Sequence, residues 1–210
     1  MVCATAKTAA DFDHYAQQME RISSKRRVAR PKPLLLFKLY EDIIMADVLF
    51  KGTPAHTTGN LPKVGSRAPD FKLTAGDLSE VSLADFKGKK KLLSIAHSLD
   101  TGVCAASTKR FNDFARKRDD VVVLIVTCDL PFAQARFCNS EGIENVITLS
   151  MMRDRKFAED YGVLLIDSPI AGLSARSTLV LDENDTVLYT QLGPELTVEP
   201  DYEPAFAALK

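Results

Sequence analysis

Short apolar runs alternate with amphipathic segments along most of this 210-residue chain. The run VVVLIVTCD at 121–129 is rich in β-branched residues, which is typical of a strand buried on both faces of a sheet. KKLLSIAHSL at 90–99 is a second short apolar run, bounded by charged residues, and NVITLS at 145–150 is a third. These three runs predict strands inside the domain.

Helical spacing appears between the apolar runs. Positions 104, 107, 111, 114 and 115 recur at intervals that place them on one face of a helix predicted over 104–118. LPFAQARFC at 130–138 predicts another helix, with a proline in its first turn, where the missing N–H has no intrahelical partner to lose. Further helices are predicted around 154–161 and from about 201 onward.

Turn signals complete the pattern. DVLFKGTPAHTTG at 47–59 predicts a short β-hairpin with Gly52 in its turn. The segment 69–89 predicts two short strands around a Gly-Asp turn, followed by one helical turn before Gly88. In STLVLDENDTVLYTQ, at 177–191, Asn184-Asp185 lies between two apolar runs and marks a second hairpin. The alternation of strands and helices predicts an α/β fold, with helices flanking a central mixed sheet and a hairpin near its N-terminal end.

The first 44 residues differ from the rest of the chain. They contain eight Lys and Arg against five Asp and Glu, and lack the apolar core and cleavage site of a secretory signal. The prolines in RPKP at 30–33 favour extended backbone. We interpret 1–44 as an accessory extension, either disordered or not part of the native protein, and place the domain at 45–210, with Met45 as its functional start.

Composition narrows the classes of function. The net charge is −1, which gives no indication of nucleic-acid binding, and no apolar run approaches the roughly 18 residues of a membrane span. The four cysteines form no C-x-x-C pair, and the three histidines show no ligand spacing, so we expect neither a metal site nor a cofactor. Cysteines this few favour a cytoplasmic protein with reduced thiols.

Cys104, in the motif DTGVCAAS, has the context of a reactive cysteine. It lies in the first turn of a predicted helix, where free backbone N–H groups and the helix dipole stabilise a thiolate. Thr101 offers a hydroxyl to the sulfur or to an incoming oxygen, and Gly102 permits a tight backbone. The alternative from the pattern alone is that Cys104 is a small apolar residue facing the core.

Six ordered blocks of the sequence resemble the thiol peroxidase branch of the peroxiredoxins, of the atypical two-cysteine type. The blocks are DTGVCAAS, DLPFAQARFC, NVITLS, GLSARS, LDEND and EPDYEPAFAALK. The resemblance extends over 45–210. It implies a thioredoxin-like fold, reduction of hydrogen peroxide and organic hydroperoxides, thioredoxin as the reductant, and a homodimer.

The resemblance also assigns roles to individual residues. Cys104 matches the peroxidatic cysteine, Thr101 its hydroxyl partner and Arg176 its guanidinium partner. Cys138 matches the resolving cysteine, which would form an intramolecular disulfide with Cys104. Cys128 is interpreted as inert core, and Cys3, in the extension, is expected to have no catalytic role.

His97 departs from the family pattern. Peroxiredoxins usually have proline seven residues before the peroxidatic cysteine, whereas this chain has IAHSLDTGVC. In one hypothesis His97 hydrogen-bonds near the sulfur and lowers the pKa of the thiol; in the other the pocket is looser and the enzyme slow. The second hypothesis leaves open a non-enzymatic redox sensor or interaction module. A general thiol-disulfide oxidoreductase is disfavoured by the absence of a C-x-x-C pair.

Overall fold

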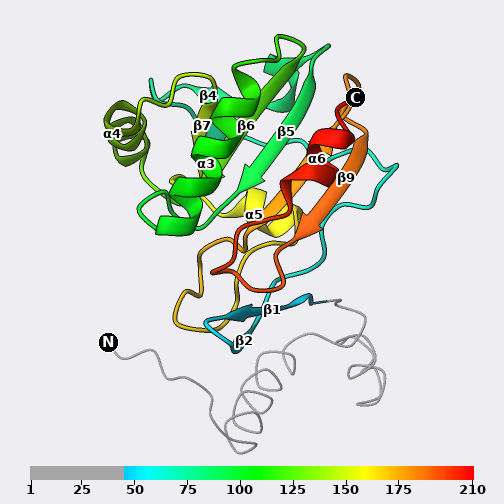
Figure 1. Cartoon of the computed structure of the whole chain (residues 1–210). Helices are drawn as coiled ribbons and strands as arrows, with labels where there is room; N and C mark the ends of the chain where they lie inside the picture. Colours follow the sequence, from blue (N-terminus) through cyan, green and yellow to red (C-terminus); the bar gives the residue numbers. More distant parts are fainter. Residues whose placement is uncertain (1–44) are drawn as a thin grey trace, which may run out of the picture. The chain divides into compact units, whose positions relative to one another are not determined.

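The computed structural model describes residues 45–210 (Figure 1), which belong to one compact unit. The predicted extension at 1–44 lies outside the described residues. Within 45–210, strands β1 (Asp47–Phe50) and β2 (Thr53–His56) form the predicted hairpin, and both turn residues, Lys51 and Gly52, have positive φ.

Seven strands of the described residues form one mixed sheet in the order β4-β3-β7-β6-β5-β8-β9. Their bounds are β3 (Leu73–Thr74), β4 (Glu80–Val81), β5 (Lys90–Ile95), β6 (Val121–Thr127), β7 (Ile147–Ser150), β8 (Ser177–Leu181) and β9 (Val187–Leu192). Strands β5, β6 and β7 are parallel, while β3, β8 and β9 pair antiparallel with their neighbours. The predicted mixed sheet is confirmed.

Helices cover both faces of this sheet. Their bounds are η1 (Leu83–Phe86), α3 (Gly102–Ala115), α4 (Pro131–Glu141), α5 (Lys156–Asp160) and α6 (Tyr202–Ala207). One apolar core contains side chains of α3, α4 and α6, and the other contains side chains of η1, α5 and the hairpin. Figure 1 shows α3 and α6 over the same face of the sheet.

The central strands contribute to both cores because successive side chains of a strand point to opposite faces. In β5, Leu93 and Ile95 pack in the core with α5, whereas Leu92 packs in the core with α3. All three side chains are fully buried. This two-sided burial explains why β5 and β6 appear in the sequence as continuous apolar runs rather than as alternating ones.

The register of β5 determines where the site forms. The apolar run predicted over 90–99 leaves the sheet after Ile95, and the chain then turns into α3, which begins at Gly102. Strand β8 runs antiparallel to β5, and Ser177 is opposite Ile95. The residue before β8 therefore lies beside the segment that connects β5 to α3.

Gly162, which follows α5, lies in close contact with the loop that contains Asn60. Its φ is +67°, and a Cβ at this position would lie 2.7 Å from the Asn60 backbone N and closer still to the Asn60 carbonyl oxygen. Since backbone atoms cannot yield as a flexible side chain does, we expect Gly162→Ala to lower the free energy of unfolding by roughly 3 kcal/mol in urea denaturation.

Gly142, at the C-terminus of α4, is the matched control. Its φ is +64°, but an added Cβ would meet nothing within 4 Å. Gly142→Ala should cost only the left-handed strain, about 1 kcal/mol. Equal losses in the two variants would show that the contact with Asn60 has no energetic importance.

Candidate active site

Cys104 is the third residue of α3, and its side chain is 1% exposed. Thr101, with extended backbone, precedes the helix. The first intrahelical bond is donated by Ala105 N to Thr101 O at 2.9 Å, so the N–H groups of the preceding three residues lack intrahelical acceptors. The cysteine therefore lies at the positive end of a 14-residue helix, as the sequence predicted.

Two buried side chains contact the sulfur. Arg176 Nη2 donates to Cys104 Sγ at 3.3 Å, and His97 Nε2 lies 3.7 Å from the same atom. Arg176 is 3% exposed and His97 6% exposed. The first hypothesis for His97 required a hydrogen bond near the sulfur, and this contact is present.

These contacts change the acidity of the thiol. Burial is the largest single effect and raises the pKa of Cys104, but the hydrogen bond and charge of His97 and the charge of Arg176 lower it, and the pKa falls to about 6. A thiol with this pKa is about nine-tenths ionised at pH 7. The contacts of the Cys104 sulfur therefore favour a thiolate at neutral pH, as a reactive cysteine requires.

Thr101 lies in the site, but its proton is directed elsewhere. Its Oγ1 donates to Ser98 O at 3.0 Å and lies 3.4 Å from His97 Nε2. The contact between the Thr101 hydroxyl and Nε2 holds the His97 ring beside the sulfur. Thr101 therefore orients His97 as well as lining the site.

Arg176 is held by a backbone carbonyl. Its Nε and Nη2 donate to Leu196 O at 3.2 and 3.1 Å, and Gly193 N donates to Arg176 O at 2.9 Å. Leu196 is fully buried. Because two donors share one acceptor, the guanidinium is fixed in orientation while Nη2 also reaches Cys104.

Glu195 connects this loop to the β1–β2 hairpin. Its carboxylate accepts from the Lys51 and Gly52 N–H groups at 3.2 and 2.9 Å and from Thr197 N at 2.9 Å. The Thr197 hydroxyl also donates to this carboxylate and has the largest effect on it. Together these hydrogen bonds lower the pKa of Glu195 to about 2. The hairpin thus supports the loop that positions Arg176, a role that the sequence did not reveal.

Cys138 lies on α4, which is joined to the α3 region, and it has no disulfide bond to Cys104. Helix α4 is joined to the α3 region by an ion pair between Arg136 and Asp100 at 3.0 Å and another between Lys109 and Glu141 at 2.5 Å. Cys138 is a half-buried free thiol, and burial raises its pKa. Among residues 45–210, neither a disulfide nor a hydrogen bond joins the two cysteines.

Cys128 is the third cysteine of the described residues, and the hydrogen-bond contact of its sulfur is with Ser174 rather than with Arg176 or His97. It is half-buried rather than fully buried, its Sγ lies 3.9 Å from Ser174 Oγ, and burial raises its pKa. Burial shifts the pKa of Cys138 in the same direction, so acidity does not separate these two thiols, and the interpretation of Cys128 as inert stays a prediction.

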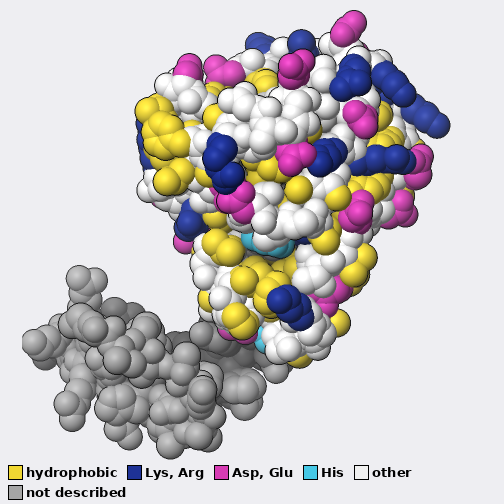
Figure 2. Space-filling model, turned by 60° about the vertical axis from the view of Figure 1, so that its left-hand side comes forward, with side chains coloured by type: hydrophobic (Ala, Val, Ile, Leu, Met, Phe, Trp, Pro, Cys, Tyr) yellow, Lys and Arg dark blue, Asp and Glu magenta, His cyan; other side chains and the backbone are white. Residues whose placement is uncertain are grey.

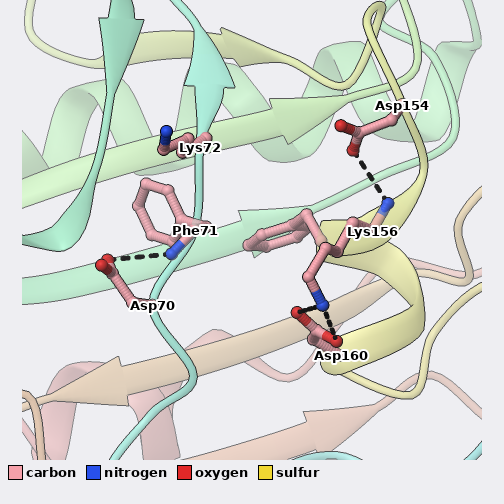
Figure 3. Close-up of a pocket in the computed structure, with 7 residues that line it drawn as sticks. Asp70, Phe71, Lys72, Asp154, Lys156 and Asp160 are labelled. Atoms are coloured by element: carbon pink, nitrogen blue, oxygen red, sulfur yellow. Dashed lines mark hydrogen bonds and ion pairs between the residues drawn. The ribbon is translucent and has the colours of Figure 1, made fainter.

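A separate pocket lies between the segment before β3 and helix α5 (Figure 3). Four of its charged residues are already engaged: Asp70 accepts from the Phe71 N–H, Asp154 from the Lys156 N–H, and Lys156 Nζ pairs with Asp160. Because none of the residues around Cys104 lines it, this pocket is distinct from the thiolate site.

Other binding features were sought in the described part of the chain. Residues 45–210 contain no cluster of three or more His, Cys, Asp or Glu side chains suited to a metal ion. No helix in this range has the length and apolar character needed to cross a bilayer. On the face drawn in Figure 2, basic and acidic side chains are interspersed rather than gathered by sign.

The titration of Cys104 tests the electrostatics of the site. Because the folded pKa is lowered, the thiolate should form as pH rises through about 6 and should be lost below it. In Arg176→Gln one positive charge is removed, so the midpoint of the thiolate ultraviolet absorbance should move up by about one pH unit. Cys104→Ser supplies the blank, and an unchanged midpoint in Arg176→Gln would contradict this account.

Glu195→Gln tests the support from the hairpin. The neutral amide is a weaker acceptor for the hairpin N–H groups, so we expect a smaller upward shift of the Cys104 midpoint than in Arg176→Gln, together with lower thermal stability. Glu183→Gln, in the β8–β9 turn, is a control that should change neither. If Glu195→Gln also changes neither, the hairpin does not position Arg176.

The chain is similar to known proteins over most of its length. Residues 63–206 match the redoxin family. A thiol peroxidase from Corynebacterium glutamicum is 49% identical over 165 residues, which cover 79% of this chain and 99% of that protein. A thiol peroxidase from Leptospira interrogans is 48% identical over 166 residues, which cover 78% and 97%.

Solved structures support the fold. A crystal structure of a peroxiredoxin-like protein from Aquifex aeolicus matches with a TM-score of 0.74 and 39% identity, covering 79% of this chain and 97% of the other. A thiol peroxidase from Chromobacterium violaceum matches with a TM-score of 0.73 at 22% identity, covering 78% and 94%. The predicted thioredoxin-like fold is confirmed, and the chain belongs to the redoxin family, within the thiol peroxidase branch of the peroxiredoxins.

Proposed function

We propose that this thiol peroxidase reduces hydrogen peroxide and organic hydroperoxides through Cys104, with Cys138 as the resolving cysteine. The observation that carries the proposal is the environment of the Cys104 sulfur, which is buried at a helix N-terminus with Arg176 Nη2 at 3.3 Å and His97 Nε2 at 3.7 Å. Such a site places a nucleophile and hydrogen-bond donors close together.

In the first step the thiolate attacks the terminal oxygen of the peroxide. The new S–O bond forms as the O–O bond breaks, so sulfur loses two electrons and the peroxide gains them, giving a sulfenic acid on Cys104 and water or an alcohol. Negative charge moves from the sulfur to the departing oxygen. Arg176 is fixed by Leu196 O, so it is already oriented to stabilise both charges without rearrangement.

In the second step the Cys138 thiol attacks the sulfenic acid, and water leaves as the Cys104–Cys138 disulfide forms. A disulfide requires Cα atoms within about 7 Å, and the Cys104 sulfur must be reached although the residue is 1% exposed in the first turn of α3. We infer that the first turn of α3 unwinds, since helix ends open at low cost. A dithiol reductant then restores both thiols by exchange.

The partners follow from the same proposal. We propose thioredoxin as the dithiol reductant, a homodimer as the assembly and the cytoplasm as the location. The reaction as proposed uses only protein side chains and so requires no metal or cofactor.

A single-turnover experiment tests the two-cysteine cycle. With one equivalent of an organic hydroperoxide, the parent chain should lose two thiols within about a second and give a Cys104–Cys138 bridge by mass spectrometry. Cys138→Ser should stop at the sulfenic acid on Cys104. Cys128→Ser is the matched control and should behave as the parent does.

Turnover separates the enzyme from a redox sensor. The parent should consume hydroperoxide repeatedly when thioredoxin, its reductase and NADPH are supplied, whereas Cys104→Ser should not. If Cys104 instead reacts over many minutes, or the disulfide forms but thioredoxin does not reduce it, the sensor or interaction module replaces the proposed enzyme.

A further inference from the structure

We propose that His97 is a catalytic proton carrier, which takes the proton of the Cys104 thiol and delivers it to the oxygen that leaves the peroxide. This inference rests on the proposed function. It assigns to His97 a role that the proline usually found at this position in the family could not perform. Proline has no side-chain proton to transfer.

The position of His97 supports this role. It follows β5 by two residues, and its Nε2 lies 3.7 Å from Cys104 Sγ and 3.4 Å from Thr101 Oγ1. The ring is 6% exposed, so bulk water has little access to it. The second ring nitrogen, Nδ1, is buried and has no hydrogen-bond partner among the described residues, so the contacts of the ring are those that Nε2 makes at the reacting sulfur.

The other donors at the site are unsuited to proton transfer. Arg176 contacts the sulfur, but a guanidinium does not lose its proton in proteins. The neighbouring hydroxyl protons are donated to backbone carbonyls: Thr101 to Ser98 O, Ser107 to Val103 O and Thr108 to Cys104 O. Among the described side chains in hydrogen-bond contact with Cys104 Sγ, His97 is therefore the one able to exchange a proton.

The charged groups around His97 leave its proton available. Arg176, which precedes β8, donates to the same sulfur. The Asp129 carboxylate, which follows β6, accepts from Leu99 N at 2.7 Å and from Thr127 Oγ1 at 2.9 Å. On α6, Tyr202 bonds to Ser107 and Glu199. Cys128, also after β6, contacts Ser174. No carboxylate in residues 45–210 forms an ion pair with His97, and the thiolate is its partner.

The proton balance of the first step follows from this pair. Neutral imidazole keeps one proton on Nδ1, and transfer of the thiol proton to Nε2 gives an imidazolium and the thiolate. As the S–O bond forms and the O–O bond breaks, Nε2 gives that proton to the departing alkoxide, which leaves as an alcohol. Sulfenic acid and neutral imidazole remain, and the ring accepts a proton again when Cys104 returns to the thiol.

Leaving-group dependence tests the proposal directly. In a Cys138→Ser background at pH 7, sulfenic acid formation is measured with tert-butyl hydroperoxide, whose leaving alkoxide needs a proton, and with peracetic acid, whose leaving carboxylate does not. We expect His97→Gln to slow the first reaction by about 100-fold, since general acid catalysis is worth at least this factor. The second should slow only a few-fold, because glutamine still donates a hydrogen bond.

The controls separate the possible failures. His56→Gln alters the other described histidine, which pairs with Asp167 in the hairpin region, and should change neither rate. If His97→Gln slows both peroxides equally, or neither, His97 is not a proton carrier. If the parent site forms no sulfenic acid with either peroxide, the proposed function fails instead.

If His97→Gln does not fold, the role of His97 can still be tested in the protein that retains this histidine. A proton in transfer gives a normal solvent deuterium isotope effect on the rate with tert-butyl hydroperoxide, and a smaller effect is expected with peracetic acid. Equal isotope effects for the two peroxides would overturn the proposal.

Discussion

The contact on which this structure depends is between the Cys104 sulfur and the two donors that face it. A thiolate buried to 1% exposure would be costly if it were unpaired. Arg176 and His97, both buried, provide donors at 3.3 and 3.7 Å, and the helix N-terminus adds its dipole. Desolvation and pairing together produce a nucleophile that is ionised yet shielded from water.

The fold brings these groups together from distant parts of the chain. The antiparallel register of β8 with β5 places Arg176 beside the segment that contains His97, and the same segment leads into α3 and Cys104. The Leu196 carbonyl then fixes Arg176, and Glu195 ties that loop to the hairpin turn. The small N-terminal hairpin is therefore part of the support of the active site.

Local patterns predicted most of the fold. The β-branched run of β6 and the Asn184-Asp185 turn were visible in the sequence because strand burial and tight turns impose strong local preferences. Cys104 at a helix start was likewise visible. The strand predicted over 90–99 was too long, since Ala96 and the following residues leave the sheet to form the site.

Other features left no trace in the sequence. The acceptor for Arg176 is the backbone carbonyl of Leu196, and every residue type has such a carbonyl. Glu195 bonds to Gly52 across 143 positions, a pairing that no local pattern encodes. The Thr101 hydroxyl donates to the Ser98 carbonyl, and the position of that carbonyl depends on the turn before α3. These contacts depend on tertiary structure rather than on residue type.

The most direct test of the central claim compares how Cys104 reacts with a hydroperoxide and with iodoacetamide, each relative to free cysteine at pH 7. Acidity alone, from a pKa near 8.5 to one of about 6, raises the thiolate fraction about 30-fold and would accelerate both reagents to that extent at most. A site with donors positioned for the departing oxygen should accelerate the peroxide far beyond this factor, and alkylation should remain within it. Equal acceleration of the two reagents would show that Cys104 is only an acidic thiol.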